Sequence, residues 1–434
     1  MPLRNKEGLP LYVFDRSRLE SAATCPRQYF WAYSFLGLGI KEIRALPAWS
    51  LLTGTYVHEG VELVMKGVDP REAAHRAVSA YSEAITPLLM ELDLGDRREL
   101  VEKECVQQLD LVKALVYGWA LIGWPRYQAQ YEVVDIEKEE ELGFLVGDTE
   151  VRLLTRADII GKLKGAEGYV IHNLKTVTDA NERWRQQWRY DQQTLTERLA
   201  TEARLEAEVV GTVIEGLCKG KKSEYPKDSG FYQHGSPLIW AWADKADGTG
   251  LPGESRAFYA SYEWTCMEPH VFSNGRKCGG GKAHRLSGVT KARVQTEYPG
   301  GIFAWVDFLY ANDHSILEQQ FISLPPLGRS EFEIERWKRQ TLPAELKRQR
   351  DAEVVNELFM AGKVDDAYRE LDFRFIQQTG HGNCTNQFGR ECDYLKLCWE
   401  ASNPLDDAIW GPRTPNHPAE AELVQISIGG SNGT

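Results

Sequence analysis

The chain has 434 residues, of which 42% are hydrophobic and 26% charged, a composition that gives a folded globular protein with one large or two medium cores. Its 51 basic and 63 acidic residues give a net charge of −12, which argues against indiscriminate binding of polyanions but permits a local basic channel. No stretch approaches the roughly 20 apolar residues that span a bilayer, and the N-terminus has no apolar signal-peptide core. We therefore expect a cytoplasmic protein with no membrane partner.

Helical patterns occupy the first 123 residues. Residues 15–35 begin a helix for which Ser17 is the expected N-cap, with Glu20 three residues later. A second helix, around residues 53–67, carries His58, and residues 71–123 are predicted to be helical throughout because their apolar residues recur near a 3.6-residue period.

A sheet is predicted next. Three runs rich in Val, Ile and Tyr, at about 131–144, 150–162 and 168–177, are separated by glycine-containing turns and read as strands. A helix over 181–205 and a strand over 208–217 follow them. A meander, a helix and a returning strand together predict a mixed sheet.

The second half of the chain is less regular. We expect strands at 257–264 and 301–309 and a helix from Ser330 to about residue 369. The predicted organisation has four parts, which are N-terminal helices with the core (1–219), an irregular insertion (220–300), a helical and cysteine-bearing segment that completes the same domain (301–402), and a flexible tail (403–434).

Polar residues interrupt two neighbouring predicted strands. Asp158 follows the apolar run that begins at residue 151, and Asn173 and Lys175 stand two residues apart in "YVIHNLKTV". Because side chains alternate across a strand, Asn173 and Lys175 point to the same face and Leu174 to the other. Oxygen ligands at strand ends suit Mg²⁺ or Mn²⁺. Taken singly, each residue also fits an ordinary role, such as a turn cap for Asp158 or a solvated charge for Lys175.

The order of these residues resembles the RecB-like branch of the PD-(D/E)XK nuclease superfamily. "TGTYVHEG" (53–60) resembles its Gly-x-x-x-His element, and "YDQQTLTERLA" (190–200) its following helix motif, with Gln193 the closest match. The resemblance covers about residues 15–219 and 370–400. It implies an α/β (mixed α+β) fold of the restriction-endonuclease type, with a central mixed sheet flanked by helices, and metal-dependent hydrolysis of DNA phosphodiester bonds.

The resemblance also assigns roles to residues. It implies that His58, Asp158 and Asn173 bind Mg²⁺ or Mn²⁺, that Lys175 positions the attacking water, and that Gln193 supports the site or the DNA.

Two positions depart from the family pattern. Asn173 stands where the family has Asp or Glu, and Glu197 stands where it has Tyr. An amide oxygen binds Mg²⁺ weakly and brings no negative charge. We interpret Asn173 as an inactivating substitution of a metal-ligand Asp; the alternative is a natural pseudo-nuclease. On the first interpretation, Asn173→Asp restores metal-dependent cleavage.

The chain has eight cysteines, four of which form a candidate cluster. Four thiolates suit a [4Fe–4S] cluster or tetrahedral zinc, and spacing alone does not choose between them, although zinc sites usually show two close Cys pairs. The set resembles the iron–sulfur branch of the same family, in which the cluster joins the N-terminal helix to the C-terminal segment. Its members are Cys25, Cys384, Cys392 and Cys398.

Cations and aromatic residues alternate in the helix that follows the three strands. Cations bind phosphates and aromatic rings stack on unpaired bases, so this mixture predicts a single-strand track. The expected DNA-binding residues are Arg185, Trp188, Arg189 and Tyr190. The alternative is an amphipathic helix with its tryptophans in the core.

These observations predict a DNA exonuclease or end-processing nuclease of replication, recombination or repair. Its expected partners are single-stranded DNA or DNA ends and the proteins of those processes, and a phage origin fits such an enzyme. The alternative is a catalytically inactive DNA-binding or scaffold protein of the same fold.

Overall fold

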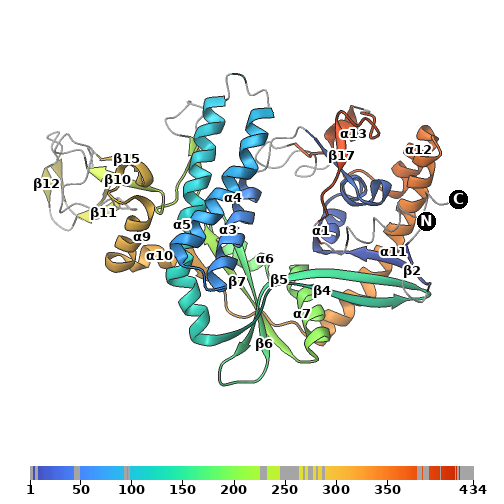
Figure 1. Ribbon diagram of the computed structural model, residues 1–434, viewed down its shortest axis with the longest axis horizontal. Helices are drawn as coiled ribbons and strands as arrows, with labels where there is room; N and C mark the ends of the chain where they lie inside the picture. Colours follow the sequence, from blue (N-terminus) through green and yellow to red (C-terminus); the bar gives the residue numbers. More distant parts are fainter. Residues whose placement is uncertain are drawn as a thin grey trace.

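The computed structural model describes residues 3–4, 8–43, 49–91, 95, 98–224, 232–244, 263–266, 269–271, 277–279, 282–285, 289–378, 384, 391–400, 402–415, 417 and 420. These residues form a mixed α/β fold with a central sheet between helical layers (Figure 1). Within this described part, every helix is too short or too polar to span a lipid bilayer.

The central sheet mixes parallel and antiparallel pairs. Six strands follow the order β1-β2-β5-β6-β7-β16, and β4 pairs with the other edge of β5. The pairs β2–β5 and β6–β7 are parallel, whereas β4–β5, β5–β6 and β7–β16 are antiparallel. The strands are β1 (Leu3–Arg4), β2 (Pro10–Phe14), β4 (Tyr131–Val146), β5 (Thr149–Leu163), β6 (Tyr169–Val177), β7 (Val209–Cys218) and β16 (Phe321–Ser323).

Long helices cover both faces of this sheet. On one face, α3 (Trp49–Met65), α4 (Pro70–Glu91) and α5 (Arg98–Gln130) stand side by side (Figure 1) and share a core with sheet residues such as Ile159, Leu174 and Val213. On the other face lies α7 (Gln192–Leu205), which contacts β4, β5 and β7. Apolar residues of α7 pack with α11 (Glu331–Met360) and β2.

Segments from the two ends of the chain form a second core. Aromatic residues of a π-helical turn η1 (Phe30–Ser34) and a 3₁₀ turn η2 (Phe35–Gly37) pack against α11 and α12 (Val364–Arg374). Strand β17 (Trp410–Pro412) pairs with β3 (Ile40–Glu42) beside them. The N-terminal segment is therefore held by residues more than 300 positions later, such as Tyr394, whose hydroxyl donates to the Ile40 carbonyl.

The remaining elements are short. The helices are α1 (Arg16–Thr24), α2 (Pro26–Tyr29), α6 (Glu182–Gln187), α8 (Val294–Glu297), α9 (Gly301–Asn312), α10 (His314–Gln320) and α13 (Leu395–Trp399). The strands, which form small two-stranded sheets in the insertion, are β8 (Lys222–Glu224), β9 (Tyr232–His234), β10 (Trp240–Asp244), β11 (Glu263–Cys266), β12 (His270–Val271), β13 (Lys277–Cys278), β14 (Lys282–Arg285) and β15 (Val289–Arg293).

Several sequence predictions are wrong at the level of single elements. Residues 301–309 form helix α9 rather than a strand, because their buried residues Ile302, Trp305, Val306 and Leu309 recur at helical spacing. The helix predicted over 181–205 is two helices, because Asp191 caps a new one by accepting from the Gln193 amide.

Other differences are smaller. The N-cap of α1 is Asp15 and not Ser17, since the Asp15 side chain accepts from the Arg18 amide. Residues 71–123 belong to two helices, α4 and α5. Strand β17 lies within the segment predicted to be a flexible tail, and residues 257–262 lie outside the described residues. The four-part division of the chain stays a prediction.

Candidate functional site

A fork in the sheet positions Asp158. Along one edge of β5, pairing with β2 ends at Leu153 and pairing with β6 begins at Ile159, so the residues between them have no strand on that side. The Leu174 amide of β6 lies beyond the last β5–β6 pair and donates instead to Asp158 Oδ2 at 2.6 Å. The carboxylate thus replaces a missing ladder partner, and this fixes its position at the fork.

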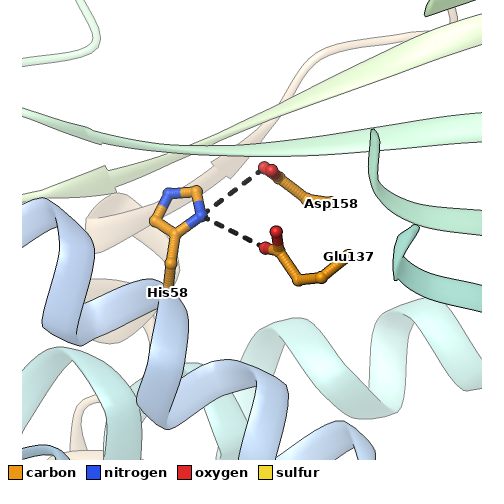
Figure 2. A group of neighbouring side chains, drawn as sticks. All are labelled: His58, Glu137 and Asp158. Atoms are coloured by element: carbon orange, nitrogen blue, oxygen red, sulfur yellow. Dashed lines mark ion pairs between the residues drawn. The ribbon is translucent and has the colours of Figure 1, made fainter. Parts of the chain in front are cut away.

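His58 and Glu137 converge on Asp158. His58 Nδ1 lies 3.7 Å from Asp158 Oδ2 and 3.8 Å from Glu137 Oε1 (Figure 2). Each of the three side chains offers a ligand atom, and these atoms lie within 4.8 Å of one another. Bonds of about 2.1 Å to a shared ion place two ligand atoms roughly 3.0 to 4.2 Å apart, so the distances from His58 to both carboxylates fit a Mg²⁺ or Mn²⁺ site.

Glu137 is a site residue that the sequence pattern did not indicate. It lies opposite Asp158, because Ile136 pairs with Ile159 and Lys138 with Ala157 across the β4–β5 hairpin. The hairpin turn could have indicated this pairing. Val146 pairs with Thr149, so the turn has only two residues, Gly147 and Asp148. If each strand is followed residue by residue away from this turn, Glu137 comes opposite Asp158.

The backbone of Glu137 is strained. Its φ is +48°, in the left-handed region that residues with a Cβ rarely adopt. Arg156 Nε holds its other oxygen at 3.0 Å. Strain of this kind persists where the surrounding structure imposes it, and it collects at functional sites. Here it accompanies a carboxylate directed at His58 and Asp158.

Asn173 and Glu197 form a buried polar pair beside these ligands. Asn173 is 0% exposed and Glu197 is 1% exposed. Asn173 Nδ2 donates to Glu197 Oε2, and Gln193 Nε2 donates to Glu197 Oε1. Asn173 Oδ1 is buried with no protein partner among the described residues. Burial raises the pKa of Glu197 to about 8, against the opposing effects of Lys175, Asn173 and Gln193.

A cleft of about 840 Å³ collects these groups. Six acidic residues line it together with four basic residues from different elements, which are Arg16 from α1, Arg156 from β5, Lys175 from β6 and Lys219 just after β7. Arg16 ties α1 to α7 by donating to Gln193 Oε1 at 2.6 Å and to Asp191 Oδ2 at 3.1 Å. The cleft therefore offers hard anionic ligands with positive charge around them, the combination that a metal-bound phosphate requires.

Two buried basic groups have lowered pKa values: Lys219, which lines the cleft, and His234 of β9. Burial, with a contribution from Lys222, lowers the pKa of Lys219 to about 8. Burial and then the charges of Lys222 and Lys219 lower the pKa of His234 to about 3. Gln108 Nε2 lies 2.8 Å from His234 Nε2, so the neutral imidazole accepts a bond that the charged ring would lose.

The predicted DNA-binding residues divide into two groups. Trp188 is only 4% exposed and packs with Trp184, Ile214 and Leu324, so it is not available to stack on a base. Tyr190 is 82% exposed, and Arg185 and Arg189 are exposed on the same segment. The alternative of core tryptophans holds for both rings, while the cations and Tyr190 remain on the surface.

The four predicted cluster cysteines line one small cavity. Cys25 lies at the junction of α1 and α2, and Cys384, Cys392 and Cys398 come from the C-terminal segment. Burial raises the pKa of the Cys398 thiol to about 12 and that of Cys392 as well, and the neighbouring thiols add to both shifts. The four thiols thus line one cavity, and zinc or an iron–sulfur cluster would bind such cysteines in their thiolate forms.

The structure thus brings His58, Asp158, Lys175 and Gln193 to one cleft, with Asn173 directly behind its wall. A family model described as the PD-(D/E)XK nuclease superfamily matches residues 16–398, which is most of the chain. No curated protein sequence matches the chain significantly.

Proposed function

Because the chain belongs to the PD-(D/E)XK nuclease superfamily, we propose that it is a metal-dependent deoxyribonuclease. The observation that carries this proposal is the convergence of His58, Glu137 and Asp158 at the fork of the sheet. Bound Mg²⁺ or Mn²⁺ would polarise the scissile phosphate and lower the pKa of water there.

The protein side chains have separate roles in this proposal. His58, Glu137 and Asp158 hold the ion, and the Leu174 amide fixes the orientation of Asp158. Lys175 extends into the cleft from the strand that carries Asn173 and positions the attacking water. Asn173 and Gln193 support the site through their shared contact with Glu197.

We propose that DNA reaches the cleft along the segment that follows β6. The exposed side chains of Arg185 and Arg189 would bind phosphates, and Tyr190 would stack on an unpaired base. This arrangement favours single-stranded DNA or DNA ends. The finer proposal, which rests on the sequence resemblance, is a RecB-like exonuclease or end-processing enzyme that works in the cytoplasm with replication or recombination proteins, as in a phage.

We propose further that Cys25, Cys384, Cys392 and Cys398 hold a [4Fe–4S] cluster, with zinc as the alternative. The cavity that these thiols share supports the proposal. A cluster there would join α1 and α2 to the C-terminal segment, next to the core that these segments already form. A brown preparation with absorbance at about 400 nm supports iron–sulfur; a colourless protein that contains zinc supports the alternative.

The nuclease proposal is tested by metal binding and by cleavage measured separately. Titration calorimetry with Mn²⁺ measures binding to the unaltered chain, to His58→Ala and to His314→Ala, a control with an exposed histidine on α10. We expect binding that only the first substitution removes. A labelled oligonucleotide, free or blocked at either end, then measures cleavage and its polarity.

The second candidate function is DNA binding without cleavage, which the neutral side chain at position 173 favours. It predicts oligonucleotide binding with no Mn²⁺-dependent cleavage of any substrate. Absence of Mn²⁺ binding by the unaltered chain contradicts the nuclease proposal outright.

A further inference from the structure

The two residues at which the chain departs from the family pattern contact each other in the structure. Asn173 of β6 donates its Nδ2 to Glu197 Oε2, on α7. In the sequence the two residues are 24 positions apart, so nothing local links them. Together they place a carboxylate on the helix and a neutral amide on the strand.

We propose that Glu197 supplies from α7 the metal-site carboxylate that β6 lacks, and that Asn173 is a positioning residue that holds it. The inference rests on the metal site proposed above. On this view Asn173 is the residue to which the site is adapted, rather than an inactivating substitution.

The position of Glu197 supports its role as the charged member of the pair. Both residues are almost fully buried, but Glu197 lines the cleft that contains His58, Glu137 and Asp158, whereas Asn173 does not. Lys175 and Asp158 are both close enough to act electrostatically on the Glu197 carboxylate. Glu197 thus lies within electrostatic reach of Asp158, one of the three convergent ligands, and a cation bound there would favour the charged form of Glu197.

The hydrogen bonds of Glu197 leave it able to bind an ion. Asn173 and Gln193 each donate one bond, to different oxygens of the carboxylate. A carboxylate has about four lone-pair sites, so each oxygen keeps one more. Two neutral donors thus hold the group in one orientation without neutralising it, which is how outer residues tune metal ligands.

The pair also explains why an Asp at position 173 is unfavourable in this chain. An Asp at this position would place its buried carboxylate at hydrogen-bonding distance from the carboxylate of Glu197. Two buried carboxylates at that distance must share a proton or repel each other. An exchange of the two groups, with Asp at 173 and an amide at 197, keeps one charge and one hydrogen bond. The effect of Asn173→Asp should therefore change sign with the residue at position 197.

Calorimetric titration with Mn²⁺ tests this expectation in four proteins: the unaltered chain, E197Q, N173D and the double variant N173D/E197Q. We expect E197Q to weaken Mn²⁺ binding by about tenfold or more, N173D to bring no gain, and the double variant to recover most of the affinity that E197Q loses. Glu202→Gln removes one charge from the same helix away from the cleft, and it should leave the affinity unchanged.

Thermal unfolding without metal provides the second measurement. N173D should lower the unfolding temperature, and E197Q in the same chain should raise it again. If N173D alone strengthens Mn²⁺ binding, or if E197Q leaves it unchanged, the inference is overturned while the metal site stands. If the unaltered chain binds no Mn²⁺, the proposed function falls and the inference falls with it. If E197Q does not fold, the response of N173D alone decides.

Discussion

The strained backbone of Glu137 allows its two roles to be separated by substitution. Gly accepts a φ of +48° without strain, whereas Ala keeps the strain, and both remove the carboxylate. The left-handed conformation costs about 1–2 kcal/mol, and the freer unfolded chain of a Gly variant offsets about 0.5–1 kcal/mol of the gain. We therefore expect Glu137→Gly to be roughly 0.5–1 kcal/mol more stable than Glu137→Ala. Loss of the Arg156 ion pair is common to both variants and cancels.

Glu206 provides the matched control. It ends α7 with a φ of +50°, and it is exposed and outside the cleft. Glu206→Gly should exceed Glu206→Ala in stability by a similar amount. With Mn²⁺ at a hundredfold excess over its Kd, binding should stabilise the unaltered chain and both 206 variants by about 2.7 kcal/mol. Neither 137 variant should gain this stabilisation.

Urea unfolding with and without Mn²⁺ measures all these differences in one assay. Equal stability of Glu137→Gly and Glu137→Ala would refute the assignment of strain. Full protection of the 137 variants by Mn²⁺ would refute the assignment of Glu137 as a ligand. The two results are independent, because one is measured without metal and the other is the response to metal.

Three further predictions concern the cluster, the buried histidine and the DNA track. Cys398→Ser should abolish absorbance at about 400 nm, which Cys218→Ser should leave intact; an unchanged spectrum in Cys398→Ser argues against the cluster. The pKa of His234 is lowered to about 3 in the folded protein. Between pH 6.5 and 3, therefore, His234 is protonated only in the unfolded chain. The folded protein should lose about 1.4 kcal/mol of stability for each pH unit below 6.5 in this range. His234→Gln should reduce that slope in urea unfolding, and an unchanged slope contradicts the prediction. Charge reversal at Arg185 and Arg189 should reduce, by about 1.4, the slope with which the logarithm of the affinity for single-stranded DNA falls with the logarithm of the salt concentration. An unchanged slope would show that these residues do not bind the DNA backbone.

The sequence predicted the parts of the fold that depend on local patterns. Strands β4, β5, β6 and β7 lie within a few residues of their expected bounds, because β-branched runs and glycine turns are local signals. The mixed sheet flanked by helices is confirmed. The order of His58, Asp158, Lys175 and Gln193 along the chain was enough to indicate one site, although their roles stay proposals.

Elements whose apolar residues fit two periods were harder to predict. The run Gly301–Leu309 has enough apolar residues for a strand, and its helical spacing became evident only from what is buried in α9. Trp188 lies among cations that suggest a DNA surface, but the core that it shares with Ile214 and Leu324 takes it out of solvent. Burial depends on partners distant in sequence, which local patterns do not specify.

The residue types and their order were determined by the sequence itself: a histidine, an acid, a lysine and a glutamine in helices and strands of the right kind. Which groups meet was decided only by the tertiary structure. The fork of β2 and β6 on β5 leaves room for His58 to reach Asp158 from α3, and the packing of α7 on the sheet sets Glu197 against Asn173. Contacts of this kind follow from strand register and helix packing, so they exist only once distant segments of the chain are in place.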